Sequence, residues 1–203
     1  MGAKVLQLRA VEYASKFNMP IRVLSSFNQG EGTLVQEEKN IMERPIVSGI
    51  SSIDTEAKLT IRGVPDIPGV AAKILGPISE AGIDVDVIVQ NVGADNTTDF
   101  TFTVDKSNFS KAENILKEIS NSLGGGLVEA DDDIAKISIV GRGMRANAGV
   151  ASKMFQALAD NEINILMITT SEIKISVVIK KGEMEEAIKA LHDAFELDKE
   201  LDG

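Results

Sequence analysis

An internal repeat restricts the possible folds of this chain more than any other feature. Apolar residues between Val70 and Ile88 are matched by apolar residues 80 positions later, between Val150 and Ile168. Spacings of i, i+4, i+5 and i+8 within each copy are typical of the buried stripe of a helix. A unit of this length that occurs twice predicts a pair of modules rather than a solenoid. The matched pairs are Val70 and Val150, Ile74 and Met154, Leu75 and Phe155, Ile78 and Leu158, Ile83 and Ile163, Val85 and Ile165, Val87 and Met167, and Ile88 and Ile168.

The first copy extends into the order strand, helix, strand, strand, helix, strand. Alternating Phe100, Phe102 and Val104 indicate its third strand. Ser107 or Ser110 can cap its second helix, which the three glycines at 124–126 end. The predicted strands of this module are 58–63, 84–91, 99–104 and 127–128, and its first helix is 69–81.

The second copy lacks a fourth strand of its own. The segment 45–50 is the unassigned strand candidate near the modules, and a turn is predicted at 51–56. We therefore predict an α+β fold of two ferredoxin-like βαββαβ modules, in which the first is inserted within the second. The other elements predicted for the second module are strands 135–140, 163–169 and 173–179 and helices 149–160 and 183–195.

Residues 1–35 differ from the modules. They suit a helix from Val5 to Phe17, which a Met-Pro pair ends, and two short strands at 21–24 and 33–35. One helix and two strands are too little to enclose a core. This part is therefore interpreted as the end of something larger or as a segment that packs on a neighbour, and the polar residues 36–44 as a linker.

Composition excludes several classes of function. The 203 residues carry a net charge of −10, which argues against a nucleic-acid surface because phosphates must be met by Lys and Arg. The absence of cysteine excludes disulfides, thiolate metal sites and a catalytic thiol. No apolar run reaches about 18 residues and no signal peptide is recognisable, so we expect a cytoplasmic protein that does not span a membrane.

The loop 64–69 is the best candidate for a binding site. It places backbone N–H groups at the start of a helix, where the dipole favours an anion. Asp66 in the same loop can accept hydrogen bonds from a cation, so a zwitterion such as a free amino acid would suit both groups. The loop could also be only a tight connection between strand and helix. The corresponding loop 142–149 has no Asp and contains two Arg residues, so the two loops are not expected to be equivalent.

Other conspicuous residues are given structural interpretations. His192 lies near a predicted helix C-terminus beside Asp193 and is interpreted as solvated. The glycines at 124–126 lack the Lys-Ser/Thr of a phosphate loop and are interpreted as a helix stop. Nothing in the sequence gathers metal ligands or a catalytic triad.

Four segments together resemble one known family. They read GVPDIPGVAAKI at 63–74, VDVIVQN at 85–91, TTDFTFTV at 97–104 and TSEIKISVVI at 170–179. They are closely similar to the regulatory region of bacterial aspartate kinase, in which two ACT domains bind end-product amino acids. Residues 1–35 are similar to the C-terminal edge of the amino-acid kinase domain of that enzyme.

The resemblance implies a division of the chain and no catalytic site within it. The Lys-x-Gly-Gly-type turn that opens the catalytic domain is absent, as are its other nucleotide-binding segments. No catalytic residue, metal ligand or cofactor is therefore expected, and ATP and Mg²⁺ are expected only for a kinase domain outside this chain. The implied parts are 1–44, a remnant of the kinase domain plus a linker; 45–56, a strand and turn that complete the second ACT module; 57–130, the first ACT domain; and 131–203, the second.

The resemblance also implies which residues bind the effector. Threonine and lysine are the feedback inhibitors in the family, often acting together. The first loop would hold the ligand, and residues of the second module would close the site. The loop of the second module is a second candidate. The implied effector-binding residues are Asp66, Ile67, Pro68, Gly69, Val70, Ala71, Gln90, Asn91, Asn164, Ile165, Ser171 and Glu172, and those of the second loop are Met144, Ala148, Gly149 and Val150.

The leading hypothesis is an allosteric module that senses threonine and/or lysine for feedback inhibition of an aspartate kinase. We expect a homodimer through the ACT modules, with the kinase catalytic domain or subunit as a partner and no nucleic acid or membrane. A purely structural dimerisation module and an ACT sensor of another amino-acid enzyme are the alternatives. Phosphoryl transfer by the chain itself would need a glycine cradle, a lysine and metal-binding acids, which are missing.

Overall fold

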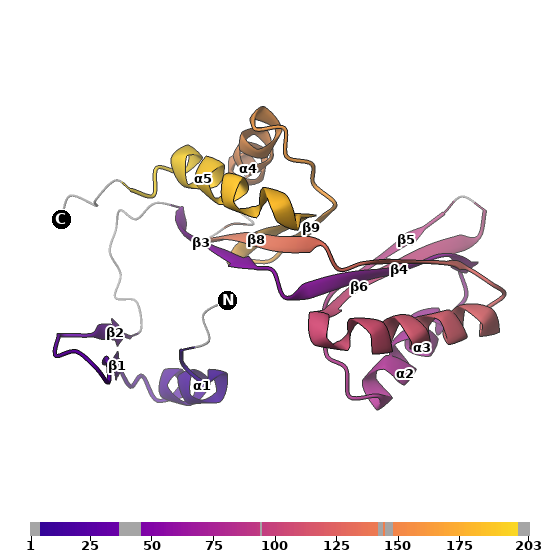
Figure 1. The fold of residues 1–203 in the computed structure, drawn as a ribbon, viewed down its shortest axis with the longest axis horizontal. Coiled ribbons are helices and arrows are strands. Elements are labelled where there is room, and N and C mark those ends of the chain that lie inside the picture. Colours follow the sequence, from indigo (N-terminus) through magenta and orange to yellow (C-terminus); the bar gives the residue numbers. More distant parts are fainter. Residues whose placement is uncertain (1–4, 37–45, 94, 142–143, 145–147, 199–203) are drawn as a thin grey trace. The chain divides into compact units, whose positions relative to one another are not determined.

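The chain divides into two compact units, residues 1–45 and 46–203. The larger unit contains all the elements of the two predicted modules (Figure 1). In the computed structural model, the described residues are 5–36, 46–93, 95–141, 144 and 148–198. Within those ranges no helix has the length and apolar character needed to cross a membrane.

The smaller unit consists of a helix and a two-stranded hairpin. Helix α1 (Leu8–Lys16) precedes strands β1 (Ile21–Val23) and β2 (Thr33–Val35), which pair antiparallel. The rings of Tyr13 and Phe17 lie 4.9 Å apart, yet both side chains are more than half exposed. None of the described side chains of this unit is buried. One helix and two short strands bury too little surface to enclose a core.

The first module is a four-stranded antiparallel sheet with two helices on one face (Figure 1). Its strands lie in the order β5-β6-β4-β7. Alternate residues of the central strands, such as Leu59 and Phe102, pack against the inner stripe of α2, which includes Ile74. The elements are β4 (Glu56–Pro65), α2 (Val70–Glu80), β5 (Val85–Val92), β6 (Thr97–Asp105), the 3₁₀ turn Lys106–Asn108, α3 (Phe109–Ser122) and β7 (Leu127–Asp131).

The second module has the same arrangement but takes one strand from outside its own segment. Strand β3 (Val47–Ile53) precedes the first module and pairs antiparallel with β8, with Ile50 opposite Ile139. In the sheet order β3-β8-β10-β9, β3 occupies the place that β7 has in the first module. This pairing confirms the predicted fold class, with the first module inserted within the second. The remaining elements are β8 (Ile134–Gly141), α4 (Ala148–Asp160), β9 (Met167–Thr170), β10 (Lys174–Lys180), the 3₁₀ turn Lys181–Glu183 and α5 (Met184–Ala194).

The sequence repeat corresponds to equivalent positions in the two cores. Four of its helical and turn pairs are buried in both copies and the pair Leu75 and Phe155 is half-buried, whereas Ile88 on β5 and Ile168 on β9 are 47% and 45% exposed. Both of these strands lie at an edge of their sheet. The repeat therefore extends beyond the cores to a matched pair of edge strands. The buried pairs are Val70 and Val150, Ile74 and Met154, Ile78 and Leu158, and Ile83 and Ile163.

The turn predicted at 51–56 is wrong in extent. Strand β3 continues to Ile53 and β4 begins at Glu56, so only Asp54 and Thr55 connect the two strands. Both strands stay extended because β3 pairs with β8 and β4 pairs with β6 up to these residues. Local sequence marks the polar residues as a turn, but pairing to distant strands decides their conformation.

Two further predictions need correction. The strand predicted from Ile163 begins only at Met167, because Ile163 packs into the core directly after α4 and its N–H bonds to the end of that helix. The predicted caps Ser107 and Ser110 do not begin the helix. Asp105 caps the preceding 3₁₀ turn instead, since its carboxylate accepts the Ser107 N–H at 2.9 Å.

Candidate functional site

The loop between β4 and α2 is shaped by backbone hydrogen bonds and one glycine. The N–H of Asp66 donates to the carbonyl of Asn96 at 2.9 Å, and that of Ile67 to Pro65 at 3.0 Å. Gly69 then adopts a φ of 89°, and no heavy atom lies within 4 Å of the place where a Cβ would stand. Glycine is favoured in this left-handed conformation because it has no Cβ to clash. Open space therefore lies beside the backbone at Gly69, where the chain enters α2.

The first turn of α2 presents backbone donors. The N–H of Val70 bonds to Ile67 at 3.1 Å. The N–H groups of Ala71 and Ala72 follow in the first turn, where a helix provides no acceptor of its own. This helix has no acidic residue in its first turn and no side-chain cap. Its positive dipole end is therefore not offset by its own side chains, which suits it to bind an anion.

Asp66 and Ile67 are exposed beside this helix start. Within the described part of the chain, the Asp66 carboxylate has no hydrogen-bond or ion-pair partner. Ile67 is 45% exposed, which leaves an apolar surface next to the charged group. The loop therefore combines hydrogen-bond donors for a carboxylate with a free acceptor for a cation.

The last residues of β5 lie at the same end of the sheet, along the strand direction, as this loop. Strand β6 lies between β5 and β4, and its first residues pair with the last residues of both. Thr97 is opposite Pro65 at the end of β4, and Thr98 is opposite Val92 at the end of β5. The Thr98 hydroxyl also donates to the carbonyl of Asn91 at 2.9 Å. These contacts hold Asn91, a predicted effector residue, at the end of the sheet that carries the loop.

The predicted residues Gln90 and Asn91 face opposite sides of the sheet. Gln90 is opposite Phe100, and Asn91 is opposite Asp99. Residues directly opposite in an antiparallel pair share a face. Phe100 is buried under the helices, so Gln90 lies on the face that carries α2 and Asn91 on the other. Of the two residues, Gln90 therefore lies on the face of the sheet that carries the start of α2.

Asp99 supports the backbone just before the loop, a role that the sequence did not predict. A bulge interrupts the pairing of β4 just before the loop, and Gly63 there has a φ of 67°. One Asp99 oxygen accepts the Gly63 N–H at 3.0 Å, and the other accepts from Arg62 at 3.4 Å. A hydrogen bond to Glu129 raises the pKa of Arg62. Asp99 thus holds the bulge that precedes the loop, and the glycine within a strand pattern was the available signal.

The predicted residues Ser171 and Glu172 lie beside the second loop rather than the first. They form the turn between β9 and β10, where the Ser171 hydroxyl accepts the Lys174 N–H at 3.2 Å. The carbonyl of Glu172 accepts the N–H of Met144 at 3.2 Å. Met144 is buried and belongs to the second loop. The structure therefore brings together Ser171, Glu172 and Met144 within one module.

The start of α4 differs from the start of α2, because α4 begins two residues before Val150, the residue that matches Val70 at the start of α2. Ala148, Gly149 and Val150 form its first turn. Gly149 is exposed and has open space at its Cβ position, while Val150 is buried. Residues 142–143 and 145–147, which include both arginines of this loop, lie outside the described residues. A role for the second loop therefore stays a prediction.

Asn164 and Ile165 lie at the other end of the second sheet. They precede β9, and the N–H of the next residue, Leu166, donates to Val178 near the end of β10 at 2.8 Å. The turn that contains Glu172 is at the opposite end of the same two strands. The four predicted residues of the second module therefore form two separate groups.

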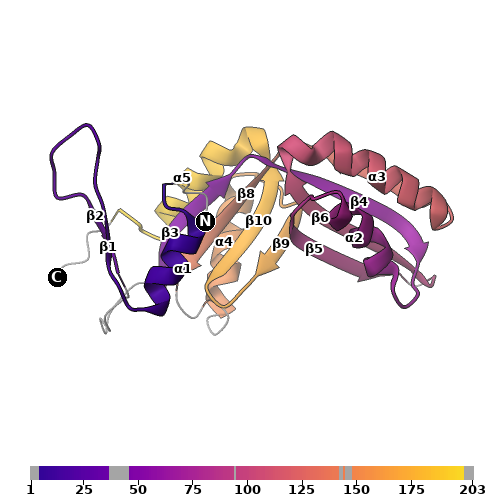
Figure 2. The ribbon, with the colours of Figure 1, turned by 90° about the horizontal axis from the view of Figure 1, so that it is seen from below.

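A single chain does not bring Asn164 to the loop of Asp66. Strand β4 leaves the junction between the modules at Glu56 and has 10 residues, about 33 Å of extended chain. Figure 2 shows β4 and β5 running away from β8, β9 and β10. Asp66 lies beyond the far end of β4, whereas Asn164 lies near the end of β10 that faces the junction.

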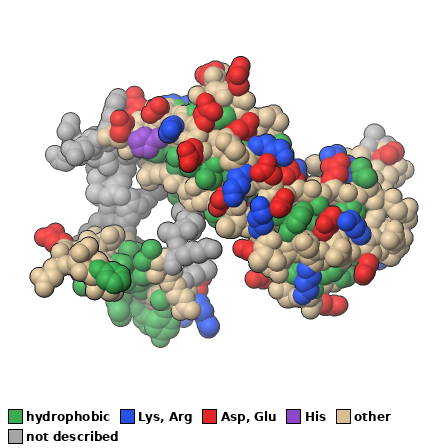
Figure 3. Space-filling view, in the orientation of Figure 1, with side chains coloured by type: hydrophobic (Ala, Val, Ile, Leu, Met, Phe, Trp, Pro, Cys, Tyr) green, Lys and Arg blue, Asp and Glu red, His purple; other side chains and the backbone are tan. Residues whose placement is uncertain are grey.

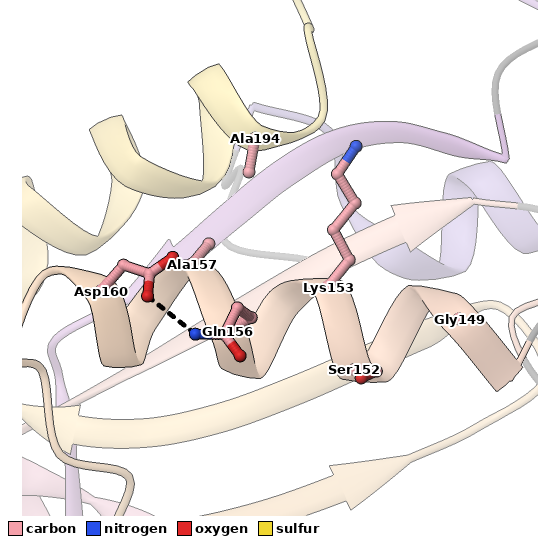
Figure 4. A pocket seen from close by; sticks show the side chains of 7 residues that line it. All are labelled: Gly149, Ser152, Lys153, Gln156, Ala157, Asp160 and Ala194. Carbon is pink, nitrogen blue, oxygen red and sulfur yellow. Dashed lines mark hydrogen bonds between the residues drawn. The ribbon is translucent and has the colours of Figure 1, made fainter.

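A shallow groove lies between α4 and α5 (Figure 4). Its volume is about 520 Å³, and of the predicted effector residues it includes only Gly149. Gln156 donates to Asp160 at 2.7 Å, and the Lys153 ammonium lies 5.3 Å from the centre of the Phe195 ring. Its charged groups are thus engaged by neighbouring side chains, and the other predicted effector residues lie elsewhere. The lining residues are Gly149, Ser152, Lys153, Gln156, Ala157, Asp160 and Ala194.

Proteins similar to this chain in sequence and fold include aspartate kinases, and two segments of the chain match the ACT domain. Residues 59–121 and 137–195 each match a model of the ACT domain. An aspartate kinase of Pseudomonas fluorescens is 61% identical over 199 residues, and an aspartokinase of Pseudomonas aeruginosa is 60% identical over 200, each covering 98% of this chain. In a crystal structure of aspartokinase alpha and beta subunits, one chain is 48% identical with a TM-score of 0.70, and the match covers 74% of this chain and 99% of that one.

The chain belongs to the aspartate kinase family.

Within this family, the chain corresponds to the regulatory part. It spans about half the length of the curated aspartate kinases that it matches, 48% of each of the two Pseudomonas proteins. It covers 99% of the regulatory subunit of aspartate kinase from Thermus thermophilus, at 40% identity and a TM-score of 0.70. The predicted membership in the regulatory region, with two ACT domains, is confirmed. The alternative of an ACT sensor from another enzyme is excluded.

Proposed function

We propose that this regulatory region binds an end-product amino acid, threonine and/or lysine, and thereby inhibits the aspartate kinase to which it belongs. The observation that carries the proposal is the loop before α2. A helix start without its own acid lies next to Asp66, whose carboxylate has no partner among the described residues. A free amino acid has the complementary carboxylate and ammonium groups.

Each group of the ligand has a partner in this proposal. The ligand carboxylate accepts hydrogen bonds from the N–H groups of Ala71 and Ala72 at the helix start. Asp66 accepts from the ammonium group or from the hydroxyl of threonine. Gln90 contributes a polar side chain from the face that carries α2, and exposed Ile67 packs against the ligand side chain.

We infer that the complete site forms between two copies of the chain. Asn164 and Ile165 are too far from Asp66 within one chain to close the site, so a second copy must supply them. The edge strands β5 and β9 expose Ile88 and Ile168, and an exposed apolar edge strand is suited to pairing with another chain. This homodimer explains why matched apolar residues stand outside both cores.

Effector binding regulates only if the two arrangements of the dimer bind it unequally. A ligand with the same affinity for both would shift nothing, however tightly it bound. A site assembled from two copies meets this requirement, because any relative movement of the copies separates its two halves. We propose that the catalytic domain or subunit, which would use ATP, Mg²⁺ and L-aspartate, senses that movement.

Residues 1–44 are proposed to be the edge of the catalytic domain. The exposed apolar side chains of the smaller unit, among them Phe27 at 96% and Tyr13 at 67%, suit packing against a larger body. A cytoplasmic location is part of the same proposal, since the pathway that makes these amino acids would be located there.

Calorimetry of the pure chain tests the effector proposal. We expect heat of binding with threonine, with lysine or with both together, and none with methionine. The melting temperature should rise with the concentration of the ligand that binds. A purely structural dimerisation module predicts no heat with any of the three and the same dimer in their absence. That result would replace the effector proposal with the structural one.

A further inference from the structure

A buried lysine joins the two modules. Ala135 and Ile137 of β8 lie in the core of the second module, so Lys136 between them points out of the helix-free face of its sheet. Its side chain is only 4% exposed. The ammonium forms ion pairs with Glu56 at the start of β4 and with Asp86 in β5, both in the first module.

This ion pair differs from a surface salt bridge. Lysine is almost never fully buried without partners, because removing its charge from water is costly unless it is paired. Glu56 is also buried, and one of its carboxylate oxygens has no hydrogen-bond partner among the described residues. The junction therefore contains two carboxylates around one ammonium group. Without Lys136, at least one buried carboxylate would be left without a counter-charge.

Exposed pairs surround this buried contact. Lys180 of β10 lies 2.8 Å from Asp131 of β7, and Lys181 lies 2.8 Å from Asp54 in the connection between β3 and β4. These side chains are roughly a quarter to a half exposed, so each pair contributes little by itself. They place the modules near each other, but the buried Lys136 has far less freedom to accept a different arrangement.

The covalent connections between the modules are short and few. The chain crosses from one sheet to the other at Asp54 and Thr55 and returns at Asp132 and Asp133. Such connections permit a rotation of one module against the other, as at a hinge. The helices of the two modules lie on opposite sides of the pair of sheets (Figure 1), so none of the described helices spans the junction. The angle between the modules therefore depends on side chains at the junction.

We propose that Lys136 is the positioning residue that fixes the angle between the two ACT modules, so that they move as one body. The helix-free faces of both sheets meet at this ammonium, and a rotation would remove it from Glu56 or Asp86. Building on the proposed effector function, this rigid junction transmits a displacement at the loop of Asp66 to the second module. The space-filling view shows acidic and basic side chains intermixed where the two modules meet (Figure 3).

The distance between the modules tests this proposal without any effector. The chain contains no cysteine, so Glu118→Cys on α3 and Glu186→Cys on α5 give two unique and exposed positions for spin labels. Pulsed electron–electron double resonance measures the distance between the two labels. The doubly labelled chain is diluted into an excess of unlabelled chain, which suppresses the signal from pairs of labels on different copies. We expect one narrow distance distribution in the parent and a broader or two-population distribution in Lys136→Met. A Lys136→Met distribution as narrow as the parent's, at the same mean distance, would overturn the proposal.

Two further variants separate positioning from folding. Lys180→Met removes an exposed lysine from the same junction and should keep the parental distribution. If Lys136→Met does not fold, the triple variant Lys136→Met, Glu56→Gln, Asp86→Asn removes all three charges together. It leaves no unpaired charge behind, so it should fold. A broad distribution in the folded triple variant supports the proposal, and a narrow one at the parental distance contradicts it.

The same labels distinguish this proposal from the effector proposal. If threonine or lysine binds, it should shift the distance distribution of the parent as a single narrow peak, and it should bind Lys136→Met without narrowing that variant's distribution. If neither amino acid binds, the effector proposal fails, while the distances in the absence of ligand still test the role of Lys136. A ligand-bound Lys136→Met with a narrow, parent-like distribution would contradict that role.

Discussion

At the scale of single residues, two carboxylates near the loop between β4 and α2 have different environments. Asp66 follows β4 and has no partner among the described residues. Asp99 is engaged on both oxygens, by the Gly63 N–H and by Arg62. The first is available to a ligand, and the second keeps the backbone in the conformation that exposes the first. Substituting either residue should weaken effector binding, but only Asp99 should change the protein without ligand.

Asp66→Ala should weaken binding of threonine or lysine by about tenfold to a hundredfold. A charge-assisted hydrogen bond is worth roughly 1.5–3 kcal/mol, and about 1.4 kcal/mol corresponds to one decade in Kd. The melting temperature without ligand should not change, because an exposed loop residue supports no core. Titration calorimetry compares the affinity of Asp66→Ala with that of the parent. The matched control is Asp84→Ala, at an exposed residue before β5. Parental affinity in Asp66→Ala would remove this residue from the site.

Asp99→Ala should loosen the bulge before the loop. It removes the acceptor of the Gly63 N–H, a loss of about 1 kcal/mol for a partly exposed group. Amide exchange at Gly63 should become faster, and exchange in the core strand residues Leu59 and Phe102 should not. Asp99→Asn keeps an oxygen for Gly63 and should retain slow exchange. Equal rates at Gly63 in the parent and in Asp99→Ala would show that the bulge does not depend on this side chain.

At the scale of elements, strand β3 belongs to the second module although it precedes the first. Ser51 of β3 lies opposite Ser138 of β8. Ser51→Pro removes a backbone donor and disfavours strand geometry, so the β3–β8 pairing should weaken. Amide exchange at Ile137 and Ile139 should accelerate far more than exchange at Leu59 in β4. Equal acceleration in both modules would show that they unfold as one unit and that β3 supports both.

At the scale of the whole molecule, acid should uncouple the modules. Burial alone would raise the pKa of Asp86, but the hydrogen bond from Lys136 and the charges of Lys136 and Lys174 together hold that pKa below its ordinary 3.8. Burial alone would likewise raise the pKa of Asp131, but the hydrogen bonds from Lys180 and from the Asp133 N–H, together with the charge of Lys180, hold that pKa below its ordinary value. A carboxyl whose folded pKa is depressed stabilises the fold above its unfolded pKa, and this stabilisation is lost as pH falls through the folded value.

The spin-label distance distribution should therefore stay narrow from pH 7 to about pH 4 and broaden below it. Lys136→Met should show a smaller change over the same interval, because the cause of the lowered Asp86 pKa is gone. Circular dichroism at each pH verifies that both modules remain folded while the distribution broadens. A distribution that stays narrow until the modules unfold would show that these ion pairs do not hold the junction.

The sequence by itself determined the two modules, their nesting and the loop between β4 and α2. The repeat is local and periodic, so it can be recognised without knowing any contact, and the missing fourth strand left 45–50 as the candidate to fill it. The glycine and proline pattern around Asp66 likewise depends on neighbouring residues only. These features follow from backbone geometry and from apolar spacing, which the linear sequence records directly.

Only the tertiary structure decided which side chains meet. The pairing of Gln90 with Phe100 follows a bulge in β5, and such a bulge changes which residues share a face without a local sequence signal. The contacts of Lys136 with Glu56 and Asp86 join residues 80 and 50 positions apart. In the sequence these three charged residues look like ordinary surface residues. They become partners in a buried contact only because the helix-free faces of the two sheets come together.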